Sequence, residues 1–113
     1  MIREKRRYIL IEASEPLDMD SGRHEFERDL HSALMAELGG IHYFAANPKF
    51  VLKLGSTAFI MKCSLIGFSD TVRAFAMIRS VGGRELGFYT LKSSGTIRAL
   101  KASAPIGTGS NKS

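Results

Sequence analysis

The sequence has little that could cross-link the chain or anchor it in a membrane: it contains one cysteine and no tryptophan, and its apolar runs are short. A single thiol cannot form an internal disulfide, and the place of Cys63 in an apolar strand pattern predicts a buried, inert side chain. No apolar run approaches the roughly 18 residues of a membrane-spanning helix. The N-terminus is charged from residue 3 and lacks the apolar core of a signal peptide. We therefore expect an intracellular, cytoplasmic protein with no membrane partner.

The chain also lacks the motifs that carry chemistry. No pair of cysteines, HExxH, GxSxG or P-loop pattern occurs. His24 and His31 fall on one expected helix, but a metal site would need further ligands. The loop that follows the first expected strand, within residues 12–20, is acidic and would repel the phosphate that a ferredoxin-like acylphosphatase binds there. We expect no catalytic residue and no cofactor bound by the chain itself, and a small ferredoxin-like metabolite-binding or regulatory domain stays open as an alternative.

The charges of this chain are segregated along the sequence. The 113 residues are 44% hydrophobic and carry a net charge of +5, which suits one globular domain with a core of its own. The net charge is +3 over residues 1–11, −6 over residues 12–37 and +8 over residues 38–113. This pattern predicts one acidic side and one basic side.

Apolar periodicity predicts four strands and two long helices. The strands are expected at residues 7–13, 50–54, 57–64 and 86–92, and the helices at 22–38 and 69–81. The first helix carries an apolar residue every four positions, namely Phe26, Leu30, Leu34 and Leu38. The glycine pairs Gly39-Gly40 and Gly82-Gly83 are expected to end the two helices.

Three short segments complete the chain. Residues 41–45 precede a break at Asn47-Pro48, and His42 is expected in a strand or a turn. Residues 97–102 are expected to form a short terminal helix or an extension of the last strand. Residues 104–113 are small and polar, so the folded domain is expected at residues 1–103 and a disordered tail at 104–113.

The order strand, helix, strand, strand, helix, strand identifies the fold class. It predicts an α+β, split βαβ sandwich, ferredoxin-like or RRM-like, with one antiparallel sheet and two helices on one face. The usual strand order of this fold, 4-1-3-2, places the first strand beside the last and antiparallel to it. Arg6 and Arg7 at the start of the first strand are then expected next to Lys92 and Ser93 at the end of the last.

This predicted junction is the candidate phosphate-binding site. Residues 89–98 run from an apolar strand into a turn of small hydroxyl side chains with one glycine, followed by an arginine. Backbone N–H groups, hydroxyls and guanidinium groups bind phosphate oxygens, and several cations together favour a polyanion. The expected RNA-binding residues are Arg3, Lys5, Arg6, Arg7, Lys62, Lys92, Ser93, Ser94, Gly95, Thr96 and Arg98.

Two other interpretations of these residues stay open. Tyr8 on the first strand and Phe59 on the third could stack bases, as in an independent RRM-like module for single-stranded RNA. The third strand, however, is a poor match to the basic-Gly-aromatic signature of such modules. Alternatively, the serine-rich turn is a simple connection and the arginines only border the sheet.

Several stretches of the sequence resemble one known family. Residues 6–12 resemble the start of the archaeal ribonuclease P protein component 2, which shares its family with a subunit of eukaryotic ribonucleases P and MRP. Residues 91–98 are similar to the closing Ser-Gly-Thr-Ile-Arg signature of that family, residues 60–63 to its third strand, and residues 70–81 to a helix rich in Ala and Ile. The resemblance covers about residues 3–101.

The resemblance implies a role that the residues alone do not reveal. It implies a non-catalytic, RNA-binding subunit of ribonuclease P, the RNA-based endoribonuclease that removes 5′ leaders from precursor tRNA. It also implies ribonuclease P RNA and ribonuclease P protein component 3 as partners, with other protein subunits, and contact with precursor tRNA only indirectly. Mg²⁺ is expected on the RNA. The partner subunit is expected either on the acidic helix or on an apolar patch near Tyr43-Phe44.

Overall fold

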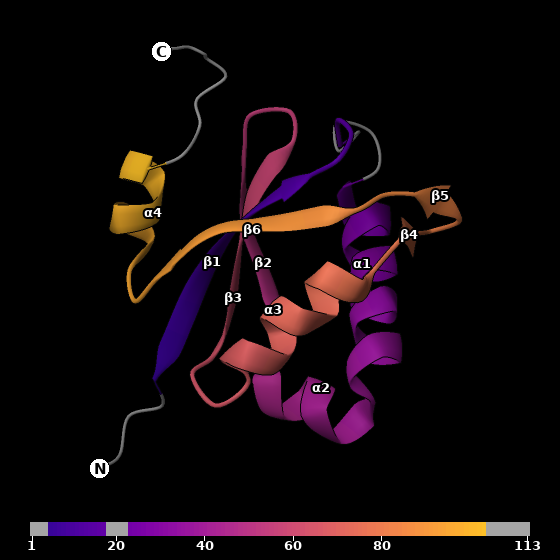
Figure 1. The fold of residues 1–113 in the computed structure, drawn as a ribbon, viewed down its shortest axis with the longest axis horizontal. Helices are drawn as coiled ribbons and strands as arrows, with labels where there is room; N and C mark the ends of the chain where they lie inside the picture. Colours follow the sequence, from indigo (N-terminus) through magenta and orange to yellow (C-terminus); the bar gives the residue numbers. More distant parts are fainter. Residues whose placement is uncertain (1–4, 18–22, 104–113) are drawn as a thin grey trace.

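The sheet of this protein has four antiparallel strands in the spatial order β2-β3-β1-β6 (Figure 1). The computed structural model describes residues 5–17 and 23–103, so Arg3 and the expected tail at 104–113 lie outside the described residues. The strands are β1 (Arg6–Ala13), β2 (Lys49–Leu54), β3 (Ala58–Ser64), β4 (Ser80–Val81), β5 (Arg84–Glu85) and β6 (Phe88–Ser94). The helices are α1 (Arg23–Leu38), α2 (Gly40–Ala46), α3 (Phe68–Met77) and α4 (Ile97–Ser103).

This arrangement confirms the predicted α+β class and the predicted strand order. β1 lies in the middle of the sheet and pairs antiparallel with both β3 and β6. β1, β3 and β6 come from distant parts of the sequence, so the sheet brings the two ends of the chain together. None of the described helices is long and apolar enough to cross a bilayer.

The main core lies between the sheet and helices α1 and α3. Phe59 of β3 is completely buried there. Its ring contacts four other phenylalanine rings, with centroid distances of 6.4 Å to Phe26, 5.3 Å to Phe50, 6.2 Å to Phe75 and 5.8 Å to Phe88. These rings come from two helices and two further strands, so this aromatic cluster ties the helical layer to the sheet. Phe59 therefore cannot stack an RNA base, and the two-aromatic platform considered from the sequence is wrong in this respect.

The apolar periodicity of the first helix predicts its packing correctly. Leu30 and Leu34 have no exposed surface, Leu38 is buried, and Phe26 packs against the same core. These side chains recur every four residues, which places them on one face of α1. The acidic residues of α1 lie on its other faces.

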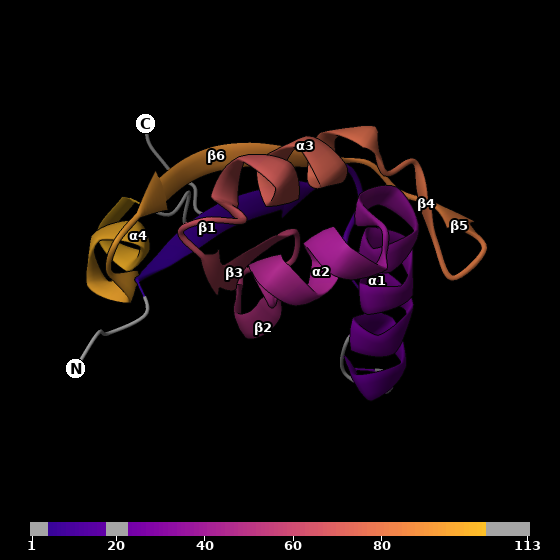
Figure 2. The ribbon, with the colours of Figure 1, turned by 90° about the horizontal axis from the view of Figure 1, so that it is seen from below.

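A second, smaller apolar cluster lies on the opposite face of the sheet. Leu10, Ala58 and Ile60 of the sheet are buried there together with Leu100 of α4. Figures 1 and 2 show α4 on the side of the sheet away from α1. Residues 97–102 therefore form a helix and not an extension of the last strand, so both faces of the sheet carry a helix. The sequence prediction of helices on one face alone was incomplete, because one buried leucine on a short segment gives no periodic signal.

The prediction of a helix over residues 69–81 was wrong at its end. α3 stops at Met77, and Ile78 is already extended, with φ −69° and ψ 130°. Ser80 and Val81 instead pair with Arg84 and Glu85 in a two-stranded hairpin. Gly82 and Gly83 have φ values of 61° and 81°. Two consecutive residues with positive φ form the tight turn of a β-hairpin, so the glycine pair makes a turn rather than a helix stop.

Residues 41–45 form a helix, so the expectation of a strand or turn around His42 was wrong. α2 ends at Ala46, and the next residue, Asn47, adopts the left-handed conformation with φ 48° and donates its N–H to the carbonyl of Tyr43. Asn is one of the few residues that adopts this conformation readily, and it is common immediately after a helix. The break predicted at Asn47-Pro48 is therefore confirmed as the point where α2 ends and β2 begins.

Replacing Phe59 with Ala is expected to lower the free energy of unfolding by about 3–5 kcal/mol, because it leaves a cavity among the four surrounding rings. Urea denaturation followed by circular dichroism measures this change. Phe44→Ala is the matched control, because Phe44 is 73% exposed; its effect is expected to stay within about 0.5 kcal/mol. Equal effects of the two variants would contradict the assignment of Phe59 to the centre of the core.

Candidate nucleic-acid interface

The start of β1 lies directly beside the end of β6, as the sequence predicts. Tyr8 is opposite Ser94, Ile9 is opposite Ser93, and Leu10 is opposite Lys92. Because the strands are antiparallel, the basic entrance to β1 and the serine-rich end of β6 meet at the same end of the sheet. The predicted junction of the two distant segments is therefore confirmed, and their role in RNA binding stays a prediction.

Arg7 connects the two segments by its side chain. Its Nη2 donates a hydrogen bond of 3.1 Å to the hydroxyl oxygen of Ser93. Its guanidinium carbon lies 5.3 Å from the centroid of the Phe68 ring at the start of α3, which is a cation–π contact. Arg7 is opposite Cys63 and half-buried on the helix-covered face. This side chain thus holds β1, β6 and α3 together, which the sequence did not indicate.

Arg6 occupies the opposite face of the sheet. Successive residues of a strand point to opposite sides, so Arg6 shares its face with Tyr8 and Leu10 rather than with Arg7. Arg6 is exposed, whereas Tyr8 is half-buried against the second apolar cluster. Lys62 of β3 lies directly opposite Tyr8. Arg6, Tyr8 and Lys62 therefore form one group at the end of the sheet face that carries α4.

The hydroxyl-rich turn between β6 and α4 already uses part of its hydrogen-bonding capacity. The N–H of Thr96 donates to the hydroxyl oxygen of Ser94 at 3.2 Å, and the N–H of Ala99 donates to that of Thr96 at 3.4 Å. Thr96 thereby caps α4. These two N–H groups are not directed at an anion as the sequence prediction supposed, although both hydroxyls keep a proton to donate. A Cβ built on Gly95 would meet no atom within 4 Å, so this position opens to solvent.

The remaining predicted cations surround the same end of the sheet. Lys92 lies opposite Leu10, and Arg98 is exposed on the first turn of α4. Lys5 is exposed just before β1, where its carbonyl accepts the N–H of Leu65 at 3.0 Å. Lys101, in the last turn of α4, is also exposed and was missed by the sequence prediction. The signal was its spacing, because Lys101 follows Arg98 by three residues and a helix at residues 97–103 places the two on neighbouring positions of one face.

The predicted separation of charge follows the layers of the fold. Glu12 is the one carboxylate among the described strand residues of the main sheet, and it lies toward the end of β1 remote from Arg6. Three arginines of the helical layer and the hairpin lie beside carboxylates: Arg28 beside Glu25, Arg73 beside Asp70, and Arg84 beside Glu15. Arg6 and Lys62 form no salt bridge with any described residue. Positive charge at the β1 entrance is thus left available to an external anion.

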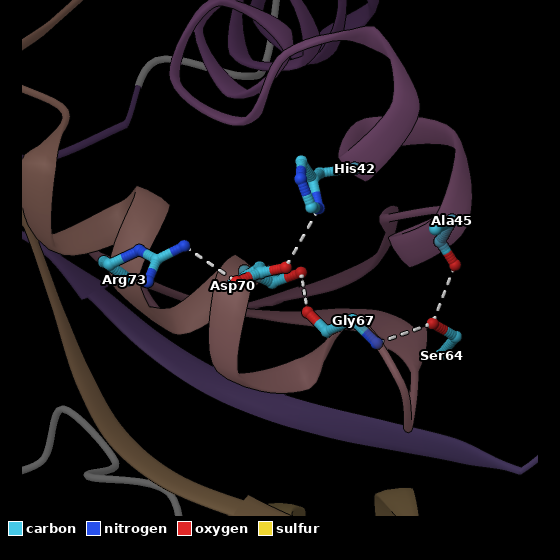
Figure 3. Close-up of polar contacts among 7 residues, drawn as sticks. His42, Ala45, Ser64, Gly67, Asp70 and Arg73 are labelled. Atoms are coloured by element: carbon cyan, nitrogen blue, oxygen red, sulfur yellow. Dashed lines mark hydrogen bonds and ion pairs between the residues drawn. The ribbon is translucent and has the colours of Figure 1, made fainter.

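The polar contacts on the helical side fasten helices to each other. In Figure 3, Asp70 of α3 contacts both His42 of α2, at 3.4 Å, and Arg73, at 2.8 Å. Ser64 donates to the carbonyl of Ala45 at 2.8 Å and accepts the N–H of Gly67 at 3.0 Å (Figure 3). These contacts fix α2 over the loop between β3 and α3. The described residues contain no cluster of three or more His, Cys, Asp or Glu side chains with the spacing of a metal site.

Three groups have a pKa that burial displaces from its ordinary value. Burial lowers the pKa of His31; Glu27 opposes this shift and Lys49 adds to it. Its Nδ1 and the Tyr43 hydroxyl form a hydrogen bond of 2.8 Å, and burial raises the pKa of that phenol. Burial also raises the pKa of the Cys63 thiol, which confirms the sequence prediction of a buried side chain. All three side chains belong to the helical side, and Cys63 is the one that comes near the basic entrance of β1, where it lies opposite Arg7.

Comparison with known proteins gives one family and one fold. A family model described as the Rpp14/Pop5 family matches residues 7–105. Among solved structures, a chain of the cryo-EM structure of yeast ribonuclease MRP matches with a TM-score of 0.57 and 13% sequence identity, over 85% of this chain and 78% of that chain. An identity this low shows a shared fold alone. No curated protein sequence gives a significant match.

Replacing Arg7 with Ala is expected to lower the free energy of unfolding by about 1–2 kcal/mol, because both the cation–π contact and the hydrogen bond to Ser93 are lost. The neighbouring variant Arg6→Ala removes the same charge from an exposed site, and its effect is expected to stay within about 0.5 kcal/mol. Urea denaturation of the two variants at equal ionic strength checks the difference. Indistinguishable midpoints would show that Arg7 does not hold β1, β6 and α3 together.

Proposed function

Because this chain belongs to the Rpp14/Pop5 family of ribonuclease P and MRP protein subunits, we propose that it binds the structured RNA of such an enzyme through the basic end of its sheet. The observation that carries this proposal is the unequal pairing of its charges. Arg28, Arg73 and Arg84 on the helical side each lie beside a carboxylate, whereas Arg6 and Lys62 have no described carboxylate partner. An RNA backbone supplies the missing negative charge, and its binding would release counterions.

The finer assignment proposed is to the archaeal ribonuclease P protein component 2. Its support is the position of the closing Ser-Gly-Thr-Ile-Arg motif, residues 94–98, between the end of β6 and the start of α4. In this proposal the enzyme removes 5′ leaders from precursor tRNA in the cytoplasm, and the RNA carries the catalysis. The contribution of the chain is to bind and orient the RNA, and its contact with precursor tRNA is indirect.

We further propose that Mg²⁺ is held by the RNA and not by this chain. The surface assigned to RNA carries ammonium and guanidinium groups, which repel a metal ion and attract phosphate. Neutralisation of phosphates by these side chains lowers the repulsion between RNA segments and so favours the compact RNA that binds Mg²⁺.

The proposed protein partner is ribonuclease P protein component 3, and the surface that supports this proposal is α2. Ile41 is 85% exposed and Phe44 is 73% exposed, although both are large apolar side chains. Exposed apolar groups of this size on one short helix are typical of a surface that another protein covers. This surface belongs to the helical side, so a partner there would leave the basic end of the sheet accessible to RNA.

The double variant Lys5→Ala, Arg98→Ala is expected to weaken binding to ribonuclease P RNA and to make it less dependent on salt. Each lost phosphate contact lowers the slope of log K against log salt by about 0.7–0.9. Filter binding from low to moderate potassium chloride measures this slope. Arg28→Ala is the matched control, because it removes an exposed arginine from acidic α1, where Glu25 lies 3.9 Å away.

Reconstitution tests the assignment itself. The RNA, the partner subunits and this chain together are expected to cleave precursor tRNA at lower Mg²⁺ than the same mixture without the chain. Unchanged cleavage with and without the chain, or a double variant that behaves like Arg28→Ala, would contradict the proposed function.

A further inference from the structure

A small hollow lies beside the basic group at the entrance to β1. It has a volume of about 80 Å³ and is lined by Arg6, Asn47, Lys62, Cys63 and Ser64. It lies at the end of β3, between the start of β1 and Asn47, the residue that follows α2. Two of its five lining residues are cations on the sheet face that carries α4, and none is acidic.

The two cations of the hollow repel each other. Arg6 lies opposite Ser64, two residues along β3 from Lys62, so Arg6 and Lys62 are diagonal neighbours across the strand pair. Like charges that are neighbours across a strand pair repel each other, and an anion between them relieves the repulsion. An arginine and a lysine that line one hollow can supply a guanidinium and an ammonium group to a phosphate.

An aromatic ring lies next to these cations. Tyr8 is on the same sheet face as Arg6, two residues further along β1, and directly opposite Lys62. Its ring packs against the second apolar cluster and remains only half-buried. A partly exposed aromatic ring beside a phosphate site is the arrangement on which single-stranded nucleic acids stack their bases. A base within a duplex is already stacked, so the ring favours an unpaired nucleotide.

α4 limits how much RNA this face can bind. Leu100 of α4 is completely buried against the next row of the sheet, where Leu10 and Ile60 are at most 1% exposed. Figure 2 shows α4 beside the end of the sheet where β1 begins and β6 ends. The row of Leu10 and Ile60 is therefore closed to RNA, and Tyr8 is the ring left at the margin. The space suits one nucleotide and not the two or three that stack on an open RRM sheet.

We propose that Arg6, Tyr8 and Lys62 bind one unpaired nucleotide of RNA, with its phosphate in the hollow between Arg6 and Lys62 and its base stacked on Tyr8. This inference rests on the proposed function and specifies which form of RNA the basic end of the sheet recognises. It adds Tyr8 as a residue that selects single-stranded over double-stranded RNA.

The test compares a single-stranded uridine octamer with a blunt 12-base-pair RNA duplex, using the full chain and fluorescence anisotropy. Tyr8→Leu keeps an apolar side chain against the second cluster but removes the aromatic face. It is expected to weaken binding of the octamer by about 5- to 150-fold and to leave binding of the duplex nearly unchanged. Tyr8→Phe is expected to bind both RNAs like the unaltered protein. Tyr89→Leu is the matched control, because Tyr89 is 63% exposed on β6, opposite Glu12 and away from the hollow.

A second pair of variants tests the phosphate site independently of Tyr8. Lys62→Gln is expected to weaken octamer binding and to lower its salt slope by about 0.7, without loss of stability of the free protein. Lys53→Gln removes the same charge from β2, where Lys53 lies opposite the buried Phe59 on the other sheet face. Its effect on octamer binding is expected to be much smaller. If Tyr8→Leu does not fold, this comparison decides the proposal.

Several results would overturn the inference. One is that Tyr8→Leu weakens octamer binding no more than Tyr89→Leu does. Another is that Lys62→Gln and Lys53→Gln have equal effects on octamer affinity and on its salt slope. Equally tight binding of a hexaglutamate peptide, with no dependence on Tyr8, would assign the hollow to an acidic protein segment instead. The proposed function can survive the failure of this inference. If the unaltered protein binds the octamer no better than the duplex, but the double variant Lys5→Ala, Arg98→Ala still weakens binding of ribonuclease P RNA, only this inference is removed.

Discussion

The pairing of β1 with β3 on one side and with β6 on the other is the interaction on which the rest of the structure depends. β1 is the strand through which the first and last parts of the chain are joined. Its alternating residues supply both apolar clusters: Ile9 and Ile11 face the helices, whereas Leu10 faces α4. A shift of one residue in this pairing would exchange the two faces and expose both clusters. The register is therefore fixed by the burial of both sides at once.

The same alternation gives two adjacent arginines different roles. Arg7 faces the helices, where Phe68 and Ser93 hold its guanidinium group. Arg6 faces the other side, where no described carboxylate neutralises it. A local run of basic residues is thus divided between the packing of the fold and the surface that remains free for a ligand. A binding surface on a rigid strand is positioned with little loss of entropy, which suits recognition of a polyanion with a defined shape.

α4 changes what this sheet can do. In an open sheet of this topology the face without α1 and α3 would be available to several bases at once. Here Leu100 covers the middle of that face, so the basic residues border a closed apolar cluster instead of a platform. In the proposed function, contacts with RNA are therefore confined to one end of the sheet. The helical side, with its acidic α1 and the exposed apolar residues of α2, remains for other contacts.

The amino-acid sequence determined the order of the four strands of the main sheet and of helices α1 and α3, the inward face of α1, the separation of charge and, through the fold class, the meeting of the two chain ends. These features depend on periodicity and composition, which are local properties of the chain. Local patterns also misled at two points: the glycine pair at residues 82–83 makes a hairpin turn, and residues 41–45 form a helix. In both cases short segments take the conformation that their tertiary neighbours stabilise, since short helices and hairpins are barely stable alone.

Only the tertiary structure decided which members of the candidate site act together. The sequence could group Arg6 with Arg7, and Tyr8 with Phe59, because they are close in the chain or similar in type. The sheet separates both pairs, since side chains alternate between its faces and the burial of Phe59 requires the helix-covered one. It groups Arg6, Tyr8 and Lys62 instead, across two strands that are far apart in sequence. That grouping depends on strand register, which is set by the packing of the whole core and by no single segment of the chain.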